Sequence, residues 1–431
     1  MAHAARVRRW EVLGLLRHPD FLKLWLGLTG SLFGMQVSGL ALPLTAVLLL
    51  GASATEMGVL GAARWLPYLL VGLFAGVWLD RVRRRPVLIA THVGRAVLLA
   101  SIPLAAVLNI LHIELLYVVS FVLGGLMIFS DAAYQSLLPS LVERDELVEG
   151  NSKLELSRSL ATIVGPGAGG WLVQVLSAPI AVAVDSLTFL VDAILVGLIR
   201  TPEPRPTGSR ASPDVWREIG EGLRWVFGNP YLRPIQATSM SFICANSVWS
   251  TVYILFLTRD LKIDPTLLGL IFAAGGPGAV LGSALAGATA RRWGLGPQIV
   301  ISQILAGAAF MLIPVAASLP SAAVPLLMVG SFVSGFMITL GSIGELSLRQ
   351  GITPQHLQGR MNATMRSLNW STVTVGALIG GVLGDSIGLA PTLLVGTLAS
   401  LLSALWVIFS PVRHVRDVHD LAPSSPTPGS R

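Results

Sequence analysis

Hydrophobic residues dominate the sequence in long runs, and short polar segments separate one run from the next. A helix needs about 20 consecutive apolar residues to cross a bilayer, and twelve runs of this kind occur along the chain. Period-two alternation of apolar and polar residues, which a membrane β-barrel requires, is scarce within them. Backbone groups that face lipid must hydrogen-bond within their own segment, so the runs predict transmembrane helices. They cover residues 21–50, 55–79, 86–108, 114–138, 152–176, 179–199, 234–257, 266–290, 297–317, 323–349, 360–385 and 390–409.

Composition and charge support this interpretation. Of the 431 residues, 53% are hydrophobic and 12% are charged, whereas soluble domains carry about 25% charged residues. If the N-terminus is cytoplasmic, the basic residues gather in the inner segments, and only Arg259 and Lys262 fall in outer loops. Positive residues accumulate on the cytoplasmic side of membrane proteins, so we expect both termini to be cytoplasmic and the protein to lie in the cytoplasmic membrane. The net charge of +7 therefore reports topology and predicts no nucleic-acid partner.

The chain repeats its glycines, prolines and arginines at an offset of 211 residues, which predicts two six-helix halves. We expect bundles over residues 1–200 and 234–411, a cytoplasmic linker over 201–233, and a disordered cytoplasmic tail over 412–431. Apolar residues at helical spacing within the linker predict an amphipathic helix on the inner membrane face, although an ordinary soluble linker helix fits the same pattern. The matching pairs are Gly58 with Gly269, Gly76 with Gly287, Arg81 with Arg292, Pro86 with Pro297, Gly124 with Gly335, Gly165 with Gly376, Gly169 with Gly380, and Gly170 with Gly381.

Enzyme chemistry finds little support in the sequence. The single cysteine, Cys244, excludes an intrachain disulfide, and the seven histidines form no metal motif. No phosphate-binding loop is present, so we expect no ATP hydrolysis, and we expect neither a cofactor nor a metal. An intramembrane enzyme or a lipid-handling membrane protein would need a converging nucleophile and base, and none is visible. We expect a monomer, and we expect its partners to be a small-molecule substrate, protons and membrane lipid.

The densest charge cluster links the second and third predicted helices in the stretch GVWLDRVRRRP. Gly76, Asp80, Arg81 and Arg85 resemble the signature that the major facilitator superfamily carries in this loop, Arg84 adds positive charge, and Arg83 stands where a second glycine is usual. The resemblance implies a cytoplasmic latch in which the aspartate caps the N-terminus of the eleventh helix. A carboxylate at a helix N-terminus contributes about 0.3–1 kcal/mol when exposed. The alternative is that the cluster only sets the membrane topology.

A second motif, in the fifth predicted helix, is IVGPGAGGW. Gly165, Pro166, Gly169 and Gly170 resemble the antiporter motif of drug:proton exporters in this superfamily. Proline bends a helix and glycines let a neighbouring helix approach closely. The alternative is a packing face of small residues with no further role.

Four longer stretches carry the resemblance to the enterobactin-exporter and macrolide-efflux branch of the superfamily, over most of residues 12–410. It implies an all-α membrane protein of the major facilitator fold, with twelve transmembrane helices in two pseudo-symmetric six-helix bundles. It also implies export of a small amphipathic molecule by proton antiport and alternating access. A proton-coupled uptake symporter is the alternative. The stretches are LLRHPDFLKLWLG, AARWLPYLLVGLFAG, LLPSLVERDELVEGNSKLELSRSLATIVGP and AVDSLTFLVDAIL.

Ionisable residues inside the predicted spans are the candidates for chemistry, since charges are costly in a bilayer. The resemblance implies that helices 1, 4, 7 and 10 line the cavity, which selects Asp131 and Glu345 as candidates for proton coupling. A carboxyl group shielded from water takes up a proton more readily than one in solution. Arg95 lies at a depth similar to that of Asp131, so the two either exchange a proton or form a structural ion pair. We interpret Asp185 and Asp192 as packing or ion-pair residues.

Polar residues in the first, second and seventh predicted helices complete the candidate cavity. Gln36 and Ser247 correspond at the repeat offset, and Asn246 lies beside Ser247. Arg64 adds a positive charge within the second helix. These four side chains either line the cavity or form hydrogen bonds between helices.

Overall fold

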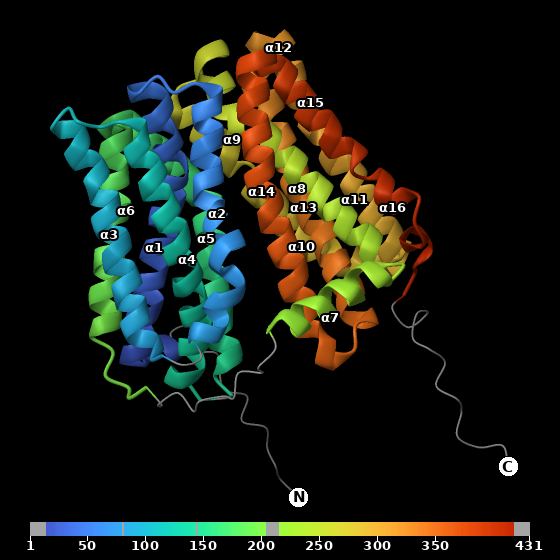
Figure 1. Ribbon diagram of the computed structural model, residues 1–431, viewed down its shortest axis with the longest axis horizontal. Helices are drawn as coiled ribbons and strands as arrows, with labels where there is room; N and C mark the ends of the chain where they lie inside the picture. The colour runs from blue at the N-terminus through green and yellow to red at the C-terminus, as the bar shows by residue number, and fades with distance from the viewer. Residues whose placement is uncertain (1–13, 80–81, 144, 204–214, 418–431) are drawn as a thin grey trace, which may run out of the picture.

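The computed structural model describes residues 14–79, 82–143, 145–203 and 215–417, and within these ranges every regular element is helical. Figure 1 shows two helical bundles side by side, with the first half of the chain in one and the second half in the other. We call the end at which α2 and α9 begin the distal end, and the end at which α1 and α8 begin the proximal end. The bundles lie close together at the distal end and diverge toward the proximal end (Figure 1).

The first bundle contains six long helices, of which the first ends in a single π-helical turn at Thr45–Leu49. They are α1 (Pro19–Leu44), α2 (Ala54–Leu79), α3 (Arg84–Val107), α4 (Ile113–Leu141), α5 (Leu147–Leu176) and α6 (Ala178–Gly197).

The second bundle has six spans as well, but three of them are interrupted. Pro277 lies in the first turn of α10, where its missing N–H removes a hydrogen bond that would continue α9. The spans are α8 (Leu232–Leu255) with the π turn Phe256–Asp260, α9 (Pro265–Ala273) with α10 (Gly275–Trp293), α11 (Leu295–Phe310) with α12 (Leu312–Ser318), α13 (Ala323–Ile352), α14 (Gln358–Ile387), and α15 (Leu389–Leu402) with α16 (Leu405–Ile408).

Length and exposure identify these helices as membrane spans. Eleven spans among the described residues are long and apolar enough to cross a bilayer. The remaining predicted span is α2, whose 26 residues extend about 39 Å at 1.5 Å per residue. Large apolar side chains face outward, including Val107, which is 73% exposed, and Phe409, which is 80% exposed. The prediction of an all-α membrane protein is confirmed.

The repeat is visible in how the bundles touch at the distal end. A Cβ atom added at Gly58 of α2 would lie 3.0 Å from the Cα of Gly381 in α14. The same measurement at Gly269 of α9 gives 3.0 Å to the Cα of Gly170 in α5. Because Gly58 and Gly269, and likewise Gly170 and Gly381, are 211 residues apart, the two contacts are one contact repeated. Glycine is needed at all four positions, since the opposing atoms are backbone.

The linker contributes one short helix, α7 (Val215–Gly228), which lies at the proximal end of the second bundle (Figure 1). Its Val226 is fully buried, whereas Arg224 is exposed, as the amphipathic pattern requires. Glu221 forms an ion pair with Arg360 in the first turn of α14. The linker helix is therefore attached to the start of the eleventh span.

Candidate substrate site between the two bundles

A pocket at the interface of the bundles brings together residues from both halves of the chain. Its cavity volume is about 280 Å³, near the lower end of the range typical of small-molecule sites. We call it the inter-bundle pocket. The first bundle contributes Leu42, Arg64 and Trp65, and the second contributes Ser247 and Thr251. The lining therefore combines apolar surface with hydroxyl groups and one guanidinium.

Two of the four predicted cavity residues, Arg64 and Ser247, line this pocket. Gln36 instead contacts α5, where its Nε2 donates to the carbonyl of Ala161 at 3.4 Å. Asn246 is half-buried on α8 and is not among the lining residues. The structure thus places Gln36 at a helix–helix contact of the first bundle.

An aromatic stack joins the bundles next to the inter-bundle pocket. Trp65 of α2 lies face to face with Trp370 of α14, with ring centroids 4.2 Å apart. Tyr68, one turn closer to the proximal end, lies 5.6 Å from Trp370. Stacked rings at this distance contribute about 0.5–1.5 kcal/mol beyond their burial. The stack therefore borders the pocket on the side that faces the proximal end.

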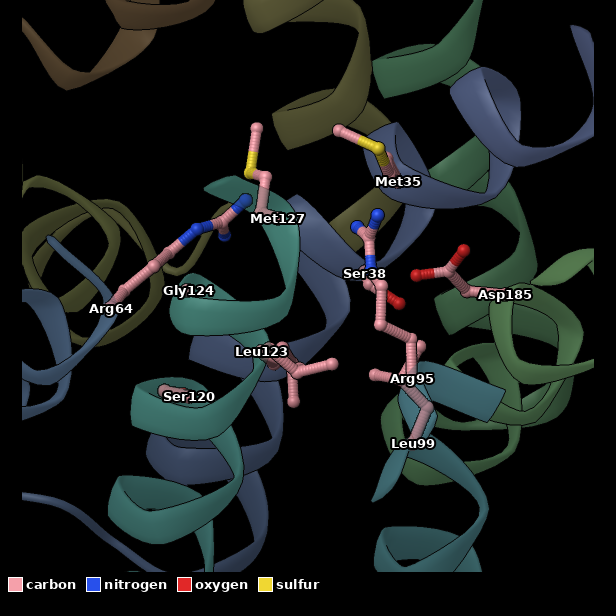
Figure 2. A pocket seen from close by; sticks show the side chains of 11 residues that line it. Met35, Ser38, Arg64, Arg95, Leu99, Ser120, Leu123, Gly124, Met127 and Asp185 are labelled. Atoms are coloured by element: carbon pink, nitrogen blue, oxygen red, sulfur yellow. The ribbon is translucent and has the colours of Figure 1, made fainter. Parts of the chain in front are cut away.

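A second pocket lies inside the first bundle, next to the inter-bundle pocket. Its lining includes Ser38 of α1, Arg64 of α2, Arg95 of α3 and Asp185 of α6, and we call it the arginine pocket. Figure 2 shows Arg64 and Arg95 entering it from opposite sides, with the Asp185 carboxylate beside Arg95. Leu42, Arg64 and Ser120 belong to the lining of both pockets, so the two adjoin.

Arg95 is buried beside Asp185 (Figure 2), but it forms no ion pair with a carboxylate in the described part of the chain. It is 7% exposed, and its Nε has no hydrogen-bond partner. Its guanidinium carbon lies 3.8 Å from the centroid of the Phe189 ring, a cation–π contact. Within the described ranges, no ion pair joins Arg95 to Asp131. Asp131 is half-buried on α4, and the charges of Arg95 and of Arg366 on α14 both act on it.

The other candidate carboxylate, Glu345, lies on α13 in the second bundle. Its Oε2 accepts a hydrogen bond of 3.4 Å from the Ser239 hydroxyl on α8. Arg349 follows one turn later, and its Nη1 lies 3.6 Å from the sulfur of Met365. Glu345 and Asp131 therefore lie in different bundles, and Glu345 lies at the contact between α8 and α13.

Asp192 belongs to a buried network that excludes it from the pockets. It is 0% exposed, and the Tyr134 hydroxyl donates to both of its carboxylate oxygens at 2.9 Å. The Nδ1 of His92 lies 3.2 Å from one of them. These three side chains connect α3, α4 and α6. Asp192 thus has a structural role, whereas Asp185, seven residues earlier, faces the arginine pocket.

The glycines of the helix-5 motif make two different contacts. A Cβ at Gly165 would lie 2.5 Å from the Cβ of Gln36, and one at Gly169 would lie 3.1 Å from the Cα of Val37, both on α1. A Cβ at Gly170 would lie 2.2 Å from the carbonyl oxygen of Pro265 in the other bundle. The motif therefore lets α5 pack closely against α1 and against the second bundle.

The distal end is held by a carboxylate that the sequence patterns did not single out. Asp385, near the end of α14, accepts hydrogen bonds from the backbone N–H groups of Ala54 at 3.0 Å and Thr55 at 2.8 Å. These residues begin α2, so the second bundle caps a helix of the first. Arg259 adds a bond of 2.7 Å from its Nη2 to the carbonyl of Ala52.

Most residues of the predicted latch at the proximal end lie outside the part of the chain that the structure describes. Asp80 and Arg81 lie outside the described residues, and so do the surroundings of Gly76. Arg84 and Arg85 are described, at the start of α3. The Arg85 backbone N–H donates to Glu203 at 3.1 Å and its Nε donates to the carbonyl of Val196 at 3.0 Å, within the first bundle. The Asp80 latch remains a prediction.

Two helical bundles with a pocket between them define a membrane transporter of the major facilitator superfamily. The chain belongs to the transmembrane secretion effector family of that superfamily, whose match covers residues 12–431. The multidrug efflux pump Tap of Mycolicibacterium fortuitum is 29% identical over 409 residues, 92% of this chain and 96% of Tap. Macrolide efflux protein A of Streptococcus pyogenes is 21% identical over 379 residues, 85% of this chain and 90% of that protein.

Solved structures resemble the fold as a whole. A bacterial homologue of the iron transporter ferroportin, in an inward-facing state, superimposes with a TM-score of 0.71 at 17% identity, covering 91% of this chain and 98% of that one. A bacterial homologue of the lysosomal transporter Spinster, also inward-facing, gives 0.69 at 12% identity, covering 94% and 98%. At these identities the likeness concerns the fold alone.

Proposed function

We propose that this protein exports small amphipathic molecules, such as drugs, antibiotics, siderophores or secondary metabolites, by proton antiport and alternating access. One observation carries the proposal: the inter-bundle pocket is lined by both bundles, so a tilt of one against the other changes which end reaches it. The outward direction is supported by its relatives, which are named multidrug and macrolide efflux pumps.

The orientation follows from the basic residues. Their distribution puts the proximal end in the cytoplasm. The contacts of Asp385 and Gly170 then close the external side, and the protein is inward-facing. In this state the substrate enters from the cytoplasm or from the inner leaflet, and export requires the distal contacts to open.

Asp131 is the first candidate for proton coupling. The positive charges that act on it come from both bundles, Arg95 from the first and Arg366 from the second. A tilt between the bundles changes the distance to Arg366, and with it the ease of protonating the carboxylate. Glu345 is the second choice, since its hydrogen-bond partner Ser239 lies within its own bundle.

Transport by inside-out membrane vesicles tests the proposal. Vesicles that contain the protein receive tritiated erythromycin, a macrolide, while an acid-inside proton gradient is imposed. We expect the label to accumulate inside, and we expect an uncoupler to release it. Vesicles without the protein, and vesicles with the gradient but with the Gly170→Leu variant, serve as controls. Accumulation that is equal in all three preparations would refute export by this protein.

A further inference from the structure

We infer that the arginine pocket binds the carboxylate of an exported molecule whose apolar body occupies the inter-bundle pocket. This inference rests on the proposed function and adds a substrate class, organic acids with an apolar portion. It follows from the charge balance of the pocket, from a buried donor that lacks an acceptor, and from the way the two pockets adjoin.

The charges that line the arginine pocket do not balance. Arg64 and Arg95 contribute two guanidinium groups, and Asp185 contributes one carboxylate. Arginine keeps its charge in proteins, so the positive excess cannot be removed by loss of a proton. Neither arginine forms an ion pair within the parts of the chain that the structure describes. Asp131 also acts on Arg95, but it lies outside the lining and is shared with Arg366. A positive excess inside the pocket is costly, and a bound anion would compensate it.

One polar atom in the pocket is buried and lacks a hydrogen-bond partner. It is the Nε of Arg95, in a residue that is 7% exposed. A guanidinium N–H can only donate, and buried polar groups in proteins are nearly always satisfied. Figure 2 shows the Arg95 guanidinium inside the pocket, opposite Arg64. A carboxylate, which accepts through two oxygens, matches guanidinium donors.

The relative sizes of the pockets assign the parts of the ligand. The arginine pocket has a cavity volume of about 30 Å³, roughly a tenth of the value of about 280 Å³ for the inter-bundle pocket. A space of this size holds a small head group and no apolar body. Its walls also include Met35, Leu123 and Met127. Since Arg64 borders both pockets, a carboxylate bound to it leaves the rest of the molecule in the larger one. The smaller pocket therefore takes the head group.

Two probes with one ring system test this assignment. The full-length protein in nanodiscs is titrated calorimetrically with 2-naphthoate and with 2-naphthalenemethanol, its neutral counterpart. We expect the carboxylate to bind at least tenfold more tightly. Arg64→Gln and Arg95→Gln should each abolish that preference. Arg349→Gln, which removes a half-buried arginine from the second bundle, should retain it and controls for the loss of one positive charge.

A fourth variant should change the affinity for naphthoate in the opposite direction. Asp185→Asn removes the carboxylate that competes for Arg95, so naphthoate should bind several-fold more tightly than it binds the parent protein. This variant keeps the inference testable if either arginine variant fails to fold. Equal binding of the two probes would overturn the inference, and so would a preference that survives both arginine substitutions or weaker naphthoate binding to Asp185→Asn.

A free inorganic anion could also compensate the positive charge of the pocket. Titration with chloride distinguishes an inorganic-anion site from a site for organic carboxylates. If naphthoate binding is preferred over the alcohol and chloride weakens it competitively, the site takes organic carboxylates. If chloride binds and naphthoate has no advantage over the alcohol, the site is an inorganic-anion site and the substrate class is wrong. Binding needs no gradient, so naphthoate binding without gradient-driven accumulation of either naphthoate or erythromycin contradicts the proposed function. Erythromycin export without naphthoate preference contradicts this inference alone.

Discussion

Adding one methyl group at Gly170 should shift the protein from the distal-closed to the distal-open state. The new Cβ would lie 2.2 Å from the Pro265 carbonyl oxygen and 2.9 Å from the Cα of Gly269, both backbone atoms of the other bundle. Such overpacking costs about 1–3 kcal/mol. The opposing atoms leave when the distal end opens, so the cost falls on the closed state alone. The equilibrium should therefore shift by about 5- to 150-fold.

Distances between spin labels measure this shift. The labels are attached at positions 49 and 387, which flank the distal contact from either bundle and carry exposed leucine and isoleucine side chains. The Cys244→Ser background removes the native cysteine. In Gly170→Ala we expect a longer distance to gain population relative to the parent protein.

Two further glycines provide the controls. Gly167→Ala should leave the distances unchanged, because its Cβ would lie 3.8 Å from the Cβ of Ala273, an ordinary contact. Gly381→Ala, at the position equivalent to Gly170, should reproduce the shift, because its Cβ would lie 2.8 Å from the carbonyl oxygen of Ala54. Identical distance distributions in the Gly170 and Gly167 variants would refute the reasoning.

Three other substitutions address closure and coupling. Asp385→Asn should raise the distal-open population in the same distance measurement, because a carboxylate at a helix N-terminus contributes about 0.3–1 kcal/mol, up to ~2 when partly buried; an unchanged distribution would show that the cap is dispensable. Asp131→Asn should preserve downhill efflux in vesicles and abolish accumulation driven by the proton gradient, whereas loss of accumulation only in Glu345→Gln would move the proton site to α13. Asp80→Asn should increase cysteine labelling of the proximal opening, and unchanged labelling with unchanged transport would leave the charge cluster a topology device.

The helices and the repeat could be predicted because both depend on local chemistry. A run of apolar residues specifies a span wherever it occurs, and the 211-residue offset follows from glycines that contact backbone, such as Gly58 and Gly381. These positions admit no other residue without a shift of the helices. The pattern of close contacts is therefore visible in the sequence, although the contact of Gly58 with Gly381 joins residues more than 300 positions apart.

The pairing of charges could not be predicted in the same way. Arg95 and Asp131 lie at similar depth, but depth says nothing about which face of a helix a side chain occupies. The structure joins α3 to α6 through a bond of 2.7 Å from the Ser186 hydroxyl to the Ala96 carbonyl, which brings Asp185 beside Arg95. Asp385 was missed for a related reason. A carboxylate at the end of a span is typical of a membrane boundary, and its partners are N–H groups of a distant helix.

Proton movement caused by the substrate tests the central claim, proton-coupled export, most directly. Purified protein is reconstituted in liposomes that contain a pH-sensitive dye, and erythromycin is added outside so that it flows inward down its gradient. Antiport requires protons to leave in exchange, so we predict that the lumen becomes alkaline, at a rate that falls to the protein-free level in Asp131→Asn. An acidified lumen would show symport, and erythromycin entry without any change in luminal pH would show that protons are not coupled. Either result would contradict the account.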